Sequence, residues 1–195
     1  SLSYAVALLD TGDPELFKRA EDILRRVIAL QDQNPDSKTY GIWSWFLEEP
    51  LDKMSPPDWN WADFCGVQLL QVALDHRHRL SPDVAAQVDA AIKHAARSIQ
   101  RRNVGPGYTN IAIMGAYVTL VAAEIYGWED LRAYALARWK RFYDYTKEQG
   151  SFTEYNSPTY IGVDLMRMAT LEEETESPEI ALKARLAEEV LWLHV

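Results

Sequence analysis

Residues that could bind or cleave a ligand gather in three long loops, and the third loop carries the clearest pair. Residues 150–160 contain one carboxylate, Glu154, and end with Tyr160 in the first turn of a predicted helix. A phenol acts as a base or an acid only where nearby positive groups lower its pKa from about 10. Tyr155 is a second candidate for that role and Asn156 a further candidate ligand contact, while a core position for Tyr160 is the alternative.

The second loop, residues 101–110, places an amide at the start of the most apolar helix. Asn110 lies in the first turn, where unpaired N–H groups and the helix dipole favour a negative charge. Its side chain could therefore donate to a carboxylate, with Arg102 as a second clamp and Tyr108 as a neighbouring contact. Such an asparagine is as often a simple cap, but Thr109 can serve as the cap instead. Both interpretations of Asn110 therefore stay open.

The first loop, residues 40–61, is rich in tryptophan and holds four of the chain's seven. Indoles are costly to expose in a loop and stack well on the apolar faces of sugars, and neighbouring Asp and Asn side chains can bind hydroxyls. The alternative is that these indoles only plug the loop onto the helix ends. The candidate sugar contacts are Trp43, Trp45, Trp59, Asn60, Trp61 and Asp63.

The histidines and the single cysteine predict neither a metal site nor a cofactor. All four histidines fall on predicted helices, and His76 and His78 are two residues apart, so they cannot share a helical face. Cys65 has no histidine in its loop to activate it, so it is expected to be a small core residue.

The formal net charge of −9 argues against nucleic acid as a partner. It also acts mildly against an acidic polysaccharide. The charge is uneven, however, because no acidic residue lies between Asp89 and Glu124 while several basic ones do. A local positive site is therefore compatible with the negative net charge. No apolar run reaches the ~18 residues of a membrane span, so no membrane partner is predicted.

Length and composition fit one globular domain, with 195 residues of which 48% are hydrophobic and 25% charged. Residues 1–9 have the character of the end of a helix and lack the pattern of a signal peptide. The last residues carry no cap. We therefore expect residues 1–195 to be a single domain that is a fragment of a longer polypeptide, with the rest missing. The compartment stays undecided, since one cysteine gives no disulfide framework.

Capping residues followed by proline mark several helix starts. Such pairs are Asp13-Pro14, Ser81-Pro82, Ser157-Pro158 and Ser177-Pro178. No segment shows the alternation that is typical of a strand. Together with the apolar spacing, these signals predict about eight helices, near 2–9, 14–32, 60–78, 82–103, 110–126, 128–148, 158–175 and 178–194.

The order of loops and turns predicts an array of helical hairpins. The helices near 60, 110 and 158 each follow a long loop and are each followed by a short turn, so a structural period of about fifty residues results. The helix near 110 is apolar all round, as an inner helix is, and its successor is amphipathic. The predicted fold is all-α, with inner helices whose N-termini gather on one face.

These loops resemble the toroid domain of heparinase II/III-type polysaccharide lyases. The likeness covers roughly residues 40–175 and rests on Thr109-Asn110-Ile111 opening a small-residue helix, followed by Gly150, Glu154 and Ser157-Pro158-Thr159-Tyr160. The family often has a histidine directly after the asparagine, where this chain has Ile111. The spacing from Glu154 to Ser-Pro is one residue longer here.

By that resemblance the fold would be part of an (α/α) toroid, and the activity would be β-elimination on a uronic-acid-containing polysaccharide. Asn110 would help to neutralise the uronate carboxylate and Tyr160 would act as base or acid. Such a lyase would be secreted or periplasmic. One alternative is a glycoside hydrolase that uses Glu154 and Asp63 as its carboxylate pair. The other is a helical-repeat scaffold that binds a glycan or a protein without chemistry.

Overall fold

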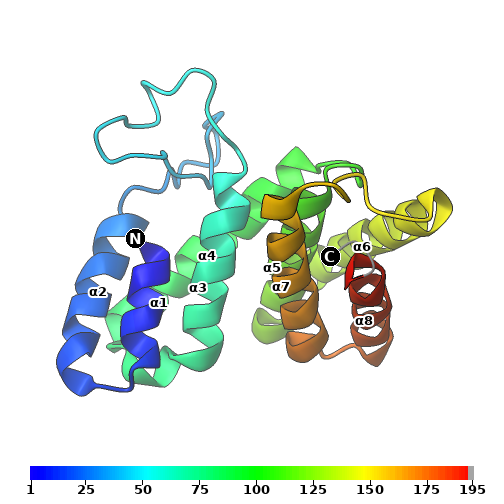
Figure 1. The fold of residues 1–195 in the computed structure, drawn as a ribbon. Coiled ribbons are helices and arrows are strands. Elements are labelled where there is room, and N and C mark those ends of the chain that lie inside the picture. Colours follow the sequence, from blue (N-terminus) through cyan, green and yellow to red (C-terminus); the bar gives the residue numbers. More distant parts are fainter. Residues whose placement is uncertain (193–195) are drawn as a thin grey trace. The chain divides into compact units, whose positions relative to one another are not determined.

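The computed structural model describes residues 1–192, and the fold of this part of the chain is of the all-α class, as predicted (Figure 1). Its only β-type pairing is an isolated bridge between Phe46 and Glu49. The helices are α1 (Leu2–Asp10), α2 (Pro14–Ile28), α3 (Trp61–Asp75), α4 (Pro82–Arg102), α5 (Thr109–Tyr126), α6 (Glu129–Gln149), α7 (Pro158–Glu174) and α8 (Pro178–Trp192), with a short 3-10 helix, η1 (Arg77–Arg79), after α3. Of the predicted helix at 178–194, residues 193 and 194 lie outside the described residues.

Proline and glycine set many of the helix ends. The carboxylate of Asp13 accepts a hydrogen bond from the N–H of Glu15, and Pro14 occupies the first position of α2. α5 and α6 end at Gly127 and Gly150, whose φ angles of 67° and 74° lie in the left-handed region that glycine tolerates. The predicted start of α2 and the predicted ends of α5 and α6 therefore agree closely with the observed ones.

α2 is shorter than predicted, because the residues after it form hydrogen bonds with the start of the tryptophan-rich loop. The N–H of Asp32 donates to the carbonyl of Ile42, and the N–H of Gly41 donates to the carbonyl of Asp32. The carboxylate of Asp32 also accepts the Thr39 hydroxyl at 2.6 Å. These bonds compete with a continued helix, so α2 ends at Ile28.

The chain divides into two compact units, Ser1–Ser98 and Ile99–Val195. In the first unit, α1 packs against α2 and α3. Leu9, Leu24 and Leu69 are among its fully buried side chains. The single domain that the sequence predicted stays a prediction, and each unit is described by itself below.

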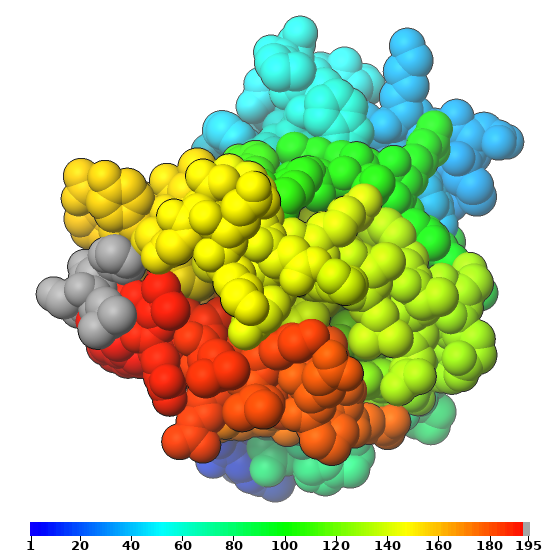
Figure 2. Space-filling model, turned by 90° about the vertical axis from the view of Figure 1, so that its right-hand side faces the viewer, coloured from blue at the N-terminus to red at the C-terminus, as the bar shows by residue number. Residues whose placement is uncertain are grey.

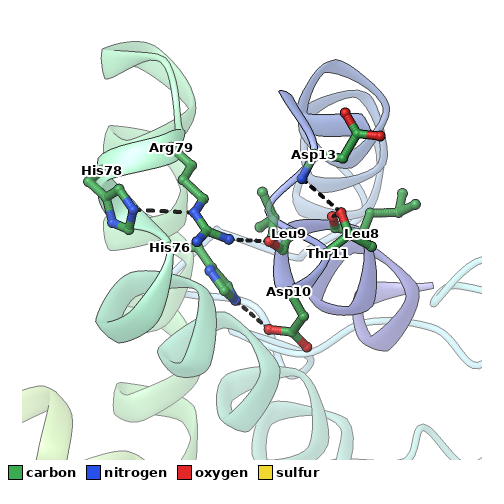
Figure 3. Close-up of polar contacts among 8 residues, drawn as sticks. All are labelled: Leu8, Leu9, Asp10, Thr11, Asp13, His76, His78 and Arg79. Carbon is green, nitrogen blue, oxygen red and sulfur yellow. Dashed lines mark hydrogen bonds and ion pairs between the residues drawn. The ribbon is translucent and has the colours of Figure 1, made fainter. Parts of the chain in front are cut away.

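Two side chains from the α3–η1 region cap the end of α1 within the first unit (Figure 3). His76 Nε2 lies 2.7 Å from Asp10 Oδ1, and the guanidinium of Arg79 donates to the carbonyl of Leu9. His78 Nε2 accepts a hydrogen bond from Arg79 Nε at 3.2 Å. The free carbonyls at a helix C-terminus need donors, and Arg79 supplies one. His76 and Arg79 therefore connect this region to α1, while His78 contacts its neighbour within η1.

In the second unit, α5 packs against both α6 and α7, and α8 packs against α7. Every residue of α5 from Thr109 to Ala123 is buried. α6 buries one side only, with Leu131, Trp139 and Phe142 in the core. The contrast between an inner and an outer helix, predicted from the sequence, is confirmed for this hairpin.

α5 is the one helix of the described chain that is long and apolar enough to cross a membrane, with a mean hydropathy of 1.3 over 18 residues. It is also 83% buried inside the protein. Its apolar character therefore matches a core helix that packs on several sides. Gly115 and Ala116 leave room for close approach of its neighbours.

Candidate functional site

The second unit holds a carboxylate at the N-terminus of α5. The N–H of Asn110 donates to Glu154 Oε2 at 2.8 Å, and Asn110 Nδ2 lies 3.0 Å from Oε1 and 2.9 Å from Oε2. Asn110 is only 1% exposed. The first turn of a helix offers unpaired N–H groups and a favourable dipole to an anion. The sequence predicted a carboxylate at this amide, and in the structure the chain's own Glu154 occupies the position.

The loop between α6 and α7 is built so that Glu154 points at α5. Its buried Phe152 packs against Phe142 of α6, with ring centroids 5.9 Å apart. Two backbone hydrogen bonds tighten the loop, from Tyr155 N–H to Phe152 O at 3.2 Å and from Ser157 N–H to Glu154 O at 3.1 Å. The buried phenylalanine anchors the loop, and the turn then fixes the backbone of Glu154.

Asp164 of α7 is a buried carboxyl group beside this pair. Its exposed fraction is 1%, and neither of its oxygens has a hydrogen-bond partner among the described residues. Burial, with a further contribution from the negative charge of Glu154, raises the pKa of Asp164 to about 8. Asp164 is therefore protonated at neutral pH. We call Asn110, Glu154 and Asp164 the α5–α7 polar cluster.

The cluster contains a further unsatisfied atom. Asn110 Oδ1 is buried and has no hydrogen-bond partner within residues 1–192. Buried acceptors without donors cost roughly 1–3 kcal/mol each, so stable proteins seldom keep several together without a reason. A polar cluster with unsatisfied buried atoms at one end of two packed helices is a candidate functional site.

Tyr160 lies one helical turn before Asp164 on α7, and its side chain is 38% exposed. The contact of Asn110 with the loop before α7 places the starts of α5 and α7 at the same end (Figure 1). Further along, Tyr117 of α5 acts electrostatically on Arg167 of α7. Residues about fifty apart are thus at the same level of the two parallel helices. Tyr160 therefore lies at the level of Asn110.

The other candidates of the second unit lie on the segments that lead into α5 and α7. Tyr108 is the N-cap residue of α5 and is exposed, as are Tyr155 and Asn156 in the loop before α7. Arg102 is the last residue of α4 and is half-buried. Loop and helix starts thus supply exposed aromatic and polar groups next to the buried cluster.

In the first unit the tryptophans differ in their roles. Trp43 is 2% exposed and its Nε1 donates to the carbonyl of Val27 at 2.8 Å, so it is a core residue. Trp59 is half-buried and its Nε1 donates to Lys38 O at 3.1 Å. Trp61 begins α3 and its ring packs near that of Phe64. Trp43 therefore fits the alternative interpretation, in which an indole only packs the loop onto the helix ends.

Trp45 is the exposed member of that group, with half of its surface in solvent. It lines a hollow of about 410 Å³ together with Glu49 and residues 54–58. Of the polar candidates in this unit, Asn60 directly precedes α3 and is half-buried, while Asp63 lies in the first turn of α3 and is buried. The first unit therefore offers one accessible aromatic platform among the sequence candidates for sugar stacking.

A second hollow, of about 580 Å³, lies between α6 and α8 of the second unit. Figure 2 shows the side of the second unit on which the yellow-green α6 and the red α8 lie next to each other. Phe142, Thr146, Leu186 and Val190 are among its lining residues. Its lining is mainly apolar, and none of the catalytic or ligand-binding candidates from the sequence is among its lining residues. No group of three or more His, Cys, Asp or Glu side chains in residues 1–192 is placed to hold a metal ion.

Asp164 is the site residue that sequence reasoning missed. It occupies the position of an apolar residue in the buried stripe Ile161, Asp164, Met168 and Leu171. An acidic residue in a core stripe at helical spacing is the signal that could have found it.

Comparison with known proteins gives one match. Neither the curated proteins nor the solved structures contain a similar chain. Residues 1–189 match a protein family described as a domain of unknown function, DUF8769. Since the match spans almost the whole sequence, this chain belongs to the DUF8769 family.

Proposed function

We propose that this chain is a carbohydrate-active domain of the (α/α) toroid type, which cleaves a uronic-acid-containing polysaccharide by β-elimination. Tyr160 is the residue that transfers the proton in this proposal. The α5 N-terminus, with Asn110, is the subsite for the uronate carboxylate. Both sit at the shared starting end of α5 and α7.

The observation that supports the proposal is the set of hydrogen bonds that Asn110 donates to a carboxylate. Backbone and side-chain N–H groups of one residue reach both oxygens of Glu154 at 2.8–3.0 Å. Charge-assisted hydrogen bonds of this kind are stronger than neutral ones. A helix start that holds one carboxylate in this way has the chemistry to hold another.

β-Elimination requires coupled bond changes at three consecutive atoms. The carbon next to the uronate carboxylate loses its proton to a base, and the released electron pair forms a carbon–carbon double bond. The bond from the next carbon to the leaving oxygen then breaks, and that oxygen takes up a proton. Donors at the carboxylate make the first proton more acidic because they stabilise the developing charge. Tyrosinate at Tyr160 takes this proton, and the tyrosine returns it to the leaving oxygen.

In this proposal the carboxylate of Glu154 occupies the subsite of the uronate carboxylate when no substrate is bound. Substrate binding then requires that Glu154 leaves Asn110, because Asn110 is buried while Glu154 holds it. The turn fixes the backbone of Glu154, but its side chain is half-buried, so rotation of that side chain towards solvent opens the subsite. Glu154→Ala would therefore tighten uronate binding, whereas Asn110→Ala would weaken it.

The test is turnover of a panel of uronate polysaccharides by the chain and two variants. Elimination releases products that absorb in the near ultraviolet, and hydrolysis does not. Tyr160→Phe should abolish product formation, since it removes only the phenol oxygen. Tyr4→Phe is the matched control, because Tyr4 is an exposed tyrosine of α1 in the first unit and its variant should keep the activity. Full activity of Tyr160→Phe would refute the assignment.

The hydrolase that pairs Glu154 with Asp63 stays a prediction, and product analysis separates it from the lyase. Asp63 is buried in α3, so it needs an opening of the first unit to meet a substrate. The binding scaffold without chemistry is favoured by a different observation. Trp45, Phe46 and Leu47 are three consecutive exposed hydrophobic residues, which is unusual at a surface without a ligand.

A further inference from the structure

The tryptophan loop of the first unit encloses the hollow that Trp45 lines. Its volume of about 410 Å³ is large enough for a ring-shaped ligand rather than for a single ion. Met54, Pro56 and Pro57 give it apolar walls, and Glu49 and Asp58 add two carboxylates. The hollow therefore combines an aromatic face, apolar sides and negative charge.

Trp45 is held in place as a platform although 51% of its surface is exposed. Its Nε1 donates to Asp58 Oδ2 at 3.0 Å, and Asp58 Oδ1 accepts the N–H of Asn60 at 3.0 Å. Phe46 meets it edge-on, with ring centroids 6.4 Å apart. An aromatic side chain that is already oriented loses little freedom when a ligand stacks on it.

The charge of the loop selects the ligand. Residues 44–58 carry four carboxylates, Glu48, Glu49, Asp52 and Asp58, against one lysine, Lys53. Such a surface repels an anionic sugar and attracts a cation. The carboxylate of Glu49 accepts no side-chain hydrogen bond from the described residues, so it is available to a ligand.

We propose that this hollow binds a sugar ring that bears a free ammonium group. The apolar C–H face of the ring stacks on the Trp45 indole, and the ammonium group pairs with Glu49 at the rim of the hollow. A bare metal ion fits poorly because the walls are apolar, and a slender side chain would leave much of the volume empty. The site belongs to the first unit and takes a ligand of opposite charge to the uronate, so it stands independently of the proposed lyase activity.

Calorimetric titration of the chain with a fully deacetylated glucosamine tetramer tests the proposal. Below the pKa of the sugar amine, we expect measurable binding that weakens with added salt, because the charges are at the surface. Above that pKa, binding should fall. Trp45→Ala should weaken binding about 10-fold, as expected for loss of a stacking and cation–π platform. Trp45→Phe should keep part of the affinity, which excludes misfolding as the cause.

The carboxylate is tested in the same way with a matched neighbour. Glu49→Gln should weaken binding about 5- to 10-fold, in the range of a partly exposed charged contact. Glu48→Gln removes the same charge next to it, at a residue that does not line the hollow, and should change little. Equal losses for the two variants would show that only the overall charge of the loop matters and would refute the site.

Three other probes decide the identity of the ligand. An N-acetylated tetramer that binds as tightly would overturn the ammonium contact, and a uronate tetramer whose binding is weakened by Trp45→Ala would overturn the charge argument. A lysine tetrapeptide that binds as tightly as the sugar would overturn the sugar ring and indicate a protein partner. Absence of binding by the glucosamine tetramer would overturn the site as a whole. None of these outcomes bears on Tyr160, whose test is the formation of unsaturated products.

Discussion

Replacement of Asp164 by asparagine should make the protein more stable at neutral pH. The pKa of Asp164 in the folded protein is about 8, because the carboxyl group is buried and faces the charge of Glu154. In the unfolded chain an aspartate has a pKa of about 3.9. Folding at neutral pH therefore requires uptake of a proton, and asparagine has nearly the same shape without that requirement.

The size of the effect follows from linkage. Because the folded pKa is raised, the contribution of Asp164 is fully present below about pH 4 and is lost as the pH rises towards about 8. The loss amounts to about 1.4 kcal/mol per pH unit, or about 4 kcal/mol at pH 7. That is a large share of the 5–15 kcal/mol typical of a folded domain, and partial opening of the site would reduce it.

Urea unfolding followed by circular dichroism measures this directly. Between about pH 5 and pH 7 the free energy of unfolding of the unchanged chain should fall by about 3 kcal/mol relative to that of Asp164→Asn. Asp144→Asn is the control, because Asp144 is exposed and its pKa is lowered by the hydrogen bond from Lys140. Its substitution should leave the slope in this pH range unchanged. Parallel pH dependence of the chain and Asp164→Asn would show that Asp164 is ionised in the folded protein and would refute the reasoning.

Three further predictions concern stability and can be checked by the same unfolding measurement. Trp43→Phe should destabilise the first unit by about 1–3 kcal/mol, because it removes a buried hydrogen bond, whereas Trp45→Phe should have little effect since Trp45 is half exposed. Gly12→Ala should lower the free energy of unfolding by about 1–2 kcal/mol, because alanine is strained at a φ of +70° although its Cβ would meet no neighbouring atom. Gly41→Ala should cost more, because its Cβ would also lie 2.3 Å from the backbone oxygen of His94. Asn110→Ala should cost about 1–3 kcal/mol by leaving its half-buried carboxylate partner, Glu154, with fewer donors.

The helices could be predicted from the sequence because their ends are encoded locally. The proline at the start of α2, α4, α7 and α8 and the glycine after α5 and α6 each act within one turn of the residue itself. The end of α2 could not be predicted in this way, because it depends on hydrogen bonds from Asp32 to residues about ten positions away. Local signals thus determine most helix boundaries, whereas the end of α2 is determined by the hydrogen bonds of Asp32 with the loop.

The sequence identified two residues of the candidate site, but it did not predict the contacts between them. Asn110 and Glu154 were each singled out, yet their hydrogen bond joins loops 44 residues apart, and nothing local encodes it. Asp164 was missed because a single carboxyl group in an apolar stripe does not break the helical period. Which tryptophan of the first loop faces solvent is decided by the fold of that loop, where Trp43 is buried and Trp45 exposed.

The central claim is that the start of α5 is a subsite for a uronate carboxylate. Nuclear magnetic resonance can follow the backbone amide and the side-chain amide of Asn110 while a uronate oligosaccharide is added. Both signals should shift together as the substrate's carboxylate replaces Glu154, and the shift should appear at lower concentration in Glu154→Ala. If the signals of Asn110 stay unchanged while the oligosaccharide binds elsewhere, the subsite assignment is contradicted.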